Sequence, residues 1–311
     1  MNSKRRLLLA AVLVAFTGVR AVSYGTALFA ASAKPIRSTP LNLPRPVRLR
    51  EVRGRGLLVS VWLNSTGPFT FAVDTGAGTT LISPRVAGAS HLKVRAASGR
   101  SIAGLSGRGV AVDEATIQAL AIGDRENLLP GASDAVVTAG LPTDIDGVLD
   151  PTQAFSSLGY VIDIPRLELS TFDPRTTPLS TDSQPSEGAV VPWLRERQSQ
   201  RPFVQLDNGD RALIDTGSSL GLAIRDLSSA NHTNASVARD VGGGQIVARR
   251  VRPTTVAIGA LMLRNIPTDL ISGAEADAPV LIGLSALRPF RLAFDPVHHL
   301  IEIAPVERAP R

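Results

Sequence analysis

The chain has 311 residues, of which 44% are hydrophobic and none is cysteine. This length can support more than one core, and the lack of cysteine excludes thiol catalysis and thiolate-bound metals. The formal net charge is +6, but the first 33 residues contribute four basic residues and no acidic one. The remaining 29 basic and 27 acidic residues leave a charge of +2. We therefore expect no nucleic-acid partner.

The N-terminal residues have the pattern of an export signal. The basic start Lys4-Arg5-Arg6 precedes an apolar run over 7–19, and an A-x-A pattern ends at Ala33. This predicts a signal peptide over 1–33 and a periplasmic or secreted protein. The apolar run is short for a membrane span. The alternative is an uncleaved N-terminal anchor, the one case in which we expect a membrane contact.

In the rest of the chain, turn residues separate short apolar runs. Residues 34–56 are basic and contain Pro and Arg, which predicts a solvated linker or a short propeptide. Short apolar runs rich in Val, Ile and Leu follow, and they favour an all-β fold. The Pro-rich polar segment 173–188 is typical of a connection between domains. We therefore predict an N-terminal lobe over 57–181 and a C-terminal lobe over 182–311.

The two predicted lobes repeat each other. Three apolar residues precede Asp74-Thr75-Gly76 in the first and Asp215-Thr216-Gly217 in the second. Further along, the tripeptide Val148-Leu149-Asp150 corresponds to Leu281-Ile282-Gly283, and each half then has an apolar residue, an aspartate and a strand-like segment. An apolar pair after each motif, Leu81-Ile82 or Leu222-Ala223, makes four features in the same order, which indicates an internal repeat.

This repeat permits a two-carboxylate chemistry. If the two loops face each other, Asp74 and Asp215 lie together and must share a proton, because both cannot ionise cheaply at that distance. One carboxyl then acts as base toward a water and the other as acid toward an amide carbonyl, without a covalent intermediate. This chemistry needs no cofactor and no metal, so we expect neither.

Neighbouring residues support the loops. Gly76 and Gly217 give the backbone freedom and allow close approach. The hydroxyls of Thr75 and Thr216 can donate to backbone groups of the opposite loop. Ser218 adds a hydroxyl beside Asp215, whereas the corresponding residue beside Asp74 is an alanine.

With these motifs, residues 57–303 resemble the aspartic peptidases of the pepsin and retropepsin clan, most closely bacterial two-lobed retropepsin-like aspartyl proteases. The resemblance implies two similar β-barrel lobes with the active site between them. It also implies an aspartic endopeptidase whose partner is a polypeptide substrate in extended conformation. Because both aspartates lie on one chain, we expect a monomer.

The chain departs from the family pattern at two positions. Gly78 stands where the family often has Ser or Thr, and Asp150 stands where the second half has Gly283. A third carboxylate near the pair could raise its pKa, or could point to solvent. The resemblance also implies a flap, for which the Gly-rich segments 98–109 and 241–246 are candidates. Each is equally a candidate for a surface hairpin without a role in binding.

Two other functions are open. Residues 217–221 match G-x-S-x-G, which with His232, His298 or His299 would suggest a serine hydrolase, but this leaves Asp74-Thr75-Gly76 unexplained. The second is a non-catalytic peptide-binding or scaffold protein of the same fold. Intact paired Asp-Thr-Gly motifs argue against it, because a scaffold has little use for two like charges in contact.

Overall fold

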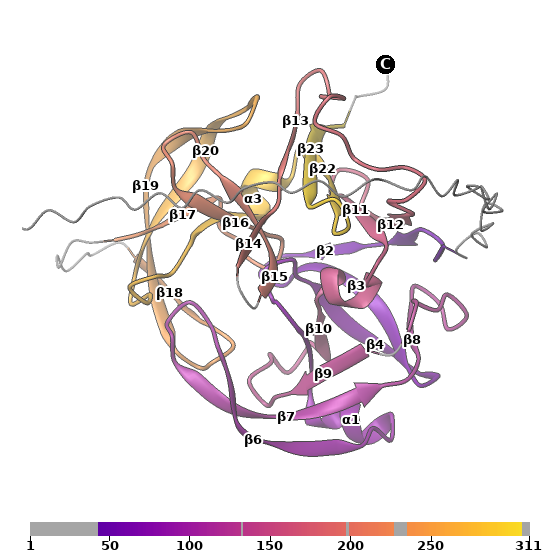
Figure 1. Cartoon of the computed structure of the whole chain (residues 1–311). Helices are drawn as coiled ribbons and strands as arrows, with labels where there is room; N and C mark the ends of the chain where they lie inside the picture. Colours follow the sequence, from indigo (N-terminus) through magenta and orange to yellow (C-terminus); the bar gives the residue numbers. More distant parts are fainter. Residues whose placement is uncertain (1–42, 132, 197–198, 227–234, 307–311) are drawn as a thin grey trace, which may run out of the picture. The chain divides into compact units, whose positions relative to one another are not determined.

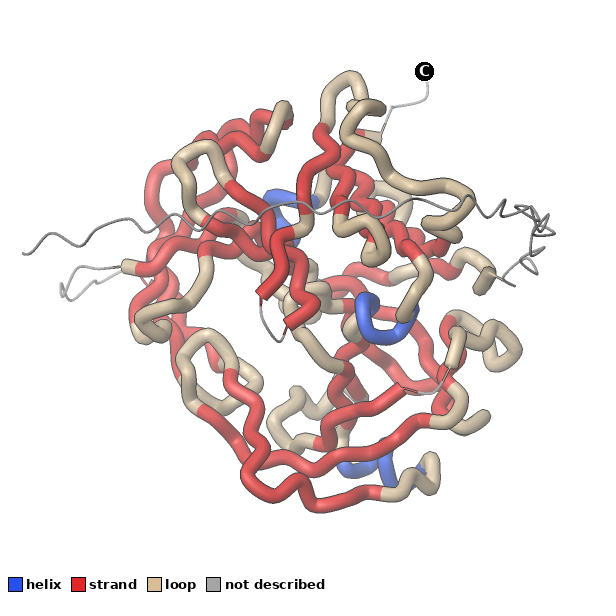
Figure 2. Tube along the Cα trace, viewed as in Figure 1, coloured by secondary structure: helices blue, strands red, loops and turns tan. Residues whose placement is uncertain are grey.

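Strands dominate the structure, and helices are limited to short turns (Figure 2). A computed structural model describes residues 43–131, 133–196, 199–226 and 235–306. All of these residues belong to one compact unit. The all-β prediction is confirmed. The predicted signal peptide and residues 34–42 lie outside the described residues.

A nine-stranded sheet, here called the first-half sheet, contains the first Asp-Thr-Gly motif. Its main order is β2-β3-β4-β10-β5-β9-β7-β6, and β8 pairs with β3 (Figure 1). The strands are β2 (Arg50–Val52), β3 (Gly56–Leu63), β4 (Thr66–Val73), β5 (Thr80–Ile82), β6 (Val94–Ala103), β7 (Gly109–Ile117), β8 (Leu120–Ile122), β9 (Ser133–Val137) and β10 (Gly147–Leu149). Along β4, Phe69, Phe71 and Val73 are buried at every second position, as a strand requires. This alternation fixes the register in which the strand arrives at Asp74.

An eight-stranded sheet, here called the second-half sheet, contains the second motif. Its order is β14-β15-β16-β21-β17-β20-β19-β18. The strands are β14 (Leu194–Glu196), β15 (Ser199–Gln205), β16 (Arg211–Asp215), β17 (Leu222–Arg225), β18 (Ala235–Arg239), β19 (Gln245–Ile258), β20 (Leu261–Ser272) and β21 (Val280–Gly283). This order matches the path of the first-half sheet strand for strand. The internal repeat in the sequence is therefore also a repeat in topology.

A six-stranded sheet joins strands from both halves in the order β1-β12-β11-β22-β23-β13. These are β1 (Val47–Arg48), β11 (Gly159–Asp163), β12 (Glu168–Phe172), β13 (Ala189–Pro192), β22 (Phe290–Asp295) and β23 (Leu300–Pro305). On it, Tyr160 stacks on Phe294 with ring centroids 4.6 Å apart, and Phe294 meets Trp193 edge-on at 6.0 Å. Such aromatic pairs add to the burial that holds the halves together.

Three short helices follow strand ends in the described residues. They are α1 (Pro84–Ala89), α2 (Pro151–Phe155) and α3 (Leu284–Leu287). Helix α2 follows β10 and helix α3 follows β21, so they occupy equivalent places in the two halves. No helix among the described residues is both long and apolar enough to span a membrane.

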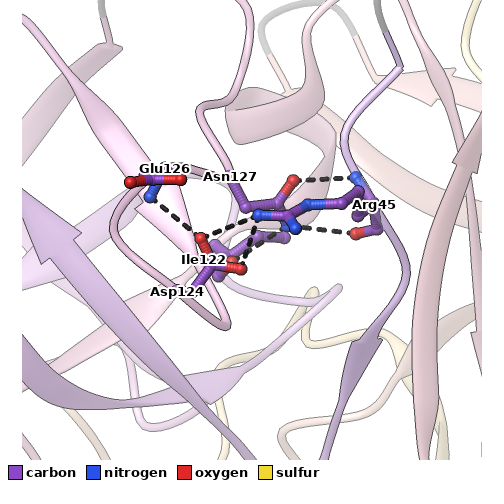
Figure 3. A network of polar contacts seen from close by, with 5 residues as sticks. All are labelled: Arg45, Ile122, Asp124, Glu126 and Asn127. Atoms are coloured by element: carbon purple, nitrogen blue, oxygen red, sulfur yellow. Dashed lines mark hydrogen bonds and ion pairs between the residues drawn. The ribbon is translucent and has the colours of Figure 1, made fainter.

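The predicted linker over 34–56 is folded in its described part. Val47 and Leu49 are buried, β1 pairs with β12, and β2 pairs with β3. Figure 3 shows how the segment is anchored: the Arg45 amide donates to Asn127 Oδ1 at 2.7 Å, and its guanidinium binds Asp124 at 2.8 Å. The apolar alternation within an Arg-rich stretch accounts for the difference, because it marks a strand rather than a solvated linker. The lobe boundary near residue 181 stays a prediction.

Candidate active site

Each Asp-Thr-Gly loop begins where a central strand ends. In the first-half sheet, β10 runs parallel to β4 with Leu149 opposite Val73, and the Asp74 amide donates to the Leu149 carbonyl at 3.0 Å. In the second-half sheet, β21 runs parallel to β16 with Gly283 opposite Asp215. The later apolar strand thus lies beside each loop, as the family resemblance implies.

The threonines tie the two loops together. The Thr75 hydroxyl donates to the Ile214 carbonyl at 2.6 Å, and the Thr216 hydroxyl donates to the Val73 carbonyl at 3.0 Å. Both side chains are buried. Each therefore binds the strand that leads into the opposite aspartate, as expected from the sequence.

The glycines allow the loops to approach. A Cβ on Gly76 would lie 2.8 Å from the Asp215 carboxyl carbon, and a Cβ on Gly217 would overlap the carboxyl of Asp74. Real Cβ atoms do not come so close to other atoms. Glycine is therefore required at both positions because each backbone lies against the opposite carboxyl group.

The carboxyl groups of Asp74 and Asp215 shift each other's pKa, and each is held by its own loop. The Gly76 amide donates to Asp74 Oδ1 at 2.7 Å, and the amides of Gly217 and Ser218 donate to Asp215 Oδ1 at 2.9 and 3.0 Å. Ser218 thus supports Asp215 through its backbone, while its hydroxyl accepts from the Leu220 amide at 3.3 Å.

The electrostatics of the pair favour a shared proton. Burial raises the pKa of Asp74, and amide donors offset part of this effect. Burial raises the pKa of Asp215 well above its usual range, and the negative charge of Asp74 raises it further. A pair that holds one proton between two carboxyls can serve as base and acid at once.

Asp150 does not point to solvent. Its side chain is buried and caps helix α2, where its carboxylate accepts from the Thr152 amide at 3.0 Å. Burial raises its pKa to about 7, and the charge of Asp74 contributes in the same direction. An Asp-Pro pair at a helix start is a known N-cap signature, so the cap could have been expected from the sequence.

Gly78 has a backbone reason for its identity. Its φ is +72°, in the left-handed region that favours glycine over Ser or Thr. The Arg201 side chain lies above it, with Cγ 3.4 Å from the position of a Cβ. Arg201 is held by Glu196 at 2.9 Å. The sequence did not indicate this cation beside the first loop.

The two flap candidates meet each other. The turn between β6 and β7 (104–108) contacts the turn between β18 and β19 (240–244), and we call this the tip contact (Figure 1). The Ser106 amide donates to Asp240 Oδ2 at 2.8 Å, and the Glu275 amide donates to the Leu105 carbonyl at 2.9 Å. A Cβ on Gly242 would overlap the carbonyl of Arg108. The Gly-rich composition therefore serves close packing between turns.

Apolar side chains of the tip contact cross between the halves. Leu105 packs against a cluster that includes Phe203 and Leu213 of the second-half sheet. Val241 packs against Leu81 and Val112 of the first-half sheet. The exchange is reciprocal, like that of the threonines.

The residues of the serine-hydrolase alternative do not assemble in the described structure. His298 and His299 lie in the turn between β22 and β23, where His298 Nδ1 lies 2.8 Å from Asp295. No hydrogen bond among the described residues joins Ser219 to either histidine, and His232 lies outside them. Within the described ranges, no three His, Asp or Glu side chains gather as a metal site.

Comparison with known proteins gives one family. Residues 59–149, which include Asp74 and β10, match a family model described as Aspartyl protease. No curated protein matches the chain. The match covers the first Asp-Thr-Gly loop together with the strand beside it, and it supports a peptidase of the aspartyl protease family.

Proposed function

We propose that the protein is an aspartic endopeptidase in which Asp74 and Asp215 form the catalytic pair, one from each half. The observation that carries this proposal is the equivalence of the two loops. Each follows a matching strand, and each is tied to the other by a buried threonine. Burial raises the pKa of both carboxyls and the charge of Asp74 raises that of Asp215 further, which supports the shared proton that the reaction needs.

The reaction uses a water between the carboxyls. The ionised carboxyl removes a proton from the water while the water oxygen attacks the scissile carbonyl carbon. The protonated carboxyl donates its proton to the carbonyl oxygen. The product of this step is a neutral tetrahedral diol. When the C–N bond breaks, the protonated carboxyl of the pair donates its proton to the amine nitrogen and the other carboxylate removes a proton from a diol hydroxyl, so the products are an amine and a carboxylic acid. The pair ends with one proton, as it began.

The proposed substrate is a polypeptide in extended conformation, cleaved without cofactor or metal. A chain with two fused halves supplies both aspartates, so the proposed state is a monomer. The proposed type is the bacterial two-lobed retropepsin-like protease. The tip contact is the proposed flap. The N-terminal pattern over 1–33 supports export to the periplasm or beyond the cell. Membrane attachment belongs to the case in which this segment is retained.

Cleavage of denatured casein between pH 3 and 8 tests the proposal. We expect cleavage by the purified protein, loss of cleavage in Asp74→Asn and in Asp215→Asn, and full activity in Ser219→Ala. Loss of cleavage in Ser219→Ala alone would favour the serine hydrolase. Folded protein that binds casein without cleaving it would favour the non-catalytic peptide-binding alternative.

A further inference from the structure

Asp150 stands beside Asp74 because of strand register. β10 and β4 run parallel with Leu149 opposite Val73. The residues that follow these two strands, Asp150 and Asp74, are therefore also neighbours. Adjacent strands lie about 4.8 Å apart. The hydrogen bond from the Asp74 amide to the Leu149 carbonyl fixes this arrangement.

The second half has no such group. Gly283 stands opposite Asp215, and a Cβ there would lie 2.5 Å from the Leu220 carbonyl oxygen. The two catalytic carboxyls are thus held by nearly equivalent loops, but only Asp74 has a third carboxyl next to it among the described residues. This asymmetry is built into the fold.

Among the described residues, no cation pairs with the Asp150 carboxylate. Its carboxylate accepts from the Thr152 amide, its amide donates to the Thr80 hydroxyl at 3.3 Å, and the Thr152 hydroxyl bonds the Tyr160 hydroxyl at 2.8 Å. The ionisable groups that interact with Asp150 are Asp74 and Tyr160, and Asp74 in turn interacts with Asp215. Strand β15, which packs on α2, carries Arg201, and that cation is paired with Glu196.

We propose that Asp150 is a positioning residue whose negative charge keeps the shared proton on the Asp74–Asp215 pair at neutral and higher pH. This inference rests on the proposed function. A nearby negative charge disfavours the doubly ionised pair, so the pair keeps its proton to higher pH. Below the pH at which Asp150 ionises, it is neutral and has no such effect. The predicted consequence is a shift of the basic limb of the pH profile, with the acid limb unchanged.

The pH dependence of kcat/KM tests this in the full chain. Asp150→Asn and Asp150→Ser both keep an N-cap for α2 and remove the charge. We expect the basic limb of both variants to move down by about one pH unit, with the acid limb unmoved. Asp163→Asn, which removes another buried carboxylate, serves as the control and should keep the parent profile. A basic limb at the parent position in both Asp150 variants, or a uniform loss of activity at all pH values, would overturn the proposal.

A second readout does not depend on peptidase activity. The carboxyl carbon of Asp150 can be titrated by NMR in the parent and in Asp74→Asn. We expect the midpoint of Asp150 to fall by about one pH unit when the charge of Asp74 is removed. An unchanged midpoint overturns the coupling. A shifted midpoint in a protein without activity would retain the coupling and reject the proposed function, so the two failures can be told apart.

Discussion

Thr75 and Thr216 donate their backbone amides to each other's hydroxyl oxygens, both at 3.1 Å. Each hydroxyl then donates onward to the backbone of the opposite half. The two loops therefore share one buried network, and neither half can complete it alone. A change in one threonine leaves polar groups of both loops without partners.

Thr75→Val tests this network, because it keeps the shape and removes the hydroxyl. We expect a loss of about 2–4 kcal/mol in the free energy of unfolding, since the Thr216 amide and the Ile214 carbonyl lose a buried partner. Thr75→Ser, which retains the hydroxyl, should lose much less. Urea denaturation of the three proteins measures this, and equal stability of the Val and Ser variants would contradict it.

Gly217→Ala tests the close approach of the loops. The added methyl group would overlap the Asp74 carboxyl, so we expect that group to move and kcat/KM to fall by at least about 100-fold. Gly88→Ala is the matched control, because a Cβ there meets nothing within 4 Å. Peptide cleavage assays, with circular dichroism to check the fold, give the comparison. Parent-like activity in Gly217→Ala would show that the carboxyl positions are not critical.

Asp150→Asn tests the burial of that carboxyl through stability. The pKa of Asp150 is raised to about 7 in the folded protein, so its folded state prefers the neutral form. Its favourable contribution is present below about pH 4 and is lost as the pH rises through 7. We expect Asp150→Asn to be more stable than the parent by roughly 2–4 kcal/mol at pH 8 and similar at pH 4. Urea denaturation at both pH values measures the free energy of unfolding of the variant and the parent. A variant less stable than the parent at pH 8 would contradict the burial of the charged carboxylate.

A disulfide across the tip contact tests whether substrate entry requires the turns to separate. The chain has no cysteine, so Arg108→Cys with Gly244→Cys introduces a single pair. A Cβ on Gly244 would lie 3.1 Å from that of Arg108, somewhat short of the usual disulfide range, but it would also overlap the Ser106 side chain, so the parent and every variant in this test carry Ser106→Gly. We expect the oxidised protein to lose casein cleavage and the reduced protein to regain it. Each single-cysteine variant is a control, and full activity of the oxidised form would exclude a flap role.

The two Asp-Thr-Gly loops could be located from the sequence because the motif occurs twice at matching places, whereas their catalytic role stays a proposal. The burial of Asp150 could not be read in the same way, because it depends on the register between β10 and β4. The tip contact joins Ser106 to Asp240 across 134 residues, and no local pattern reports such a pairing. Burial of Val47 and Leu49 was hidden by the arginines at positions 45, 48 and 50 around them.

In the proposed mechanism, Asp74 and Asp215 act as one unit. The most direct measurement is kcat/KM for peptide cleavage by Asp74→Asn, Asp215→Asn and the double variant, each checked for folding. Because one proton is shared between the two groups, we predict that either single change removes nearly all activity and that the double change costs no more. Losses that add in the double variant, or substantial activity in either single variant, would contradict the shared-proton pair.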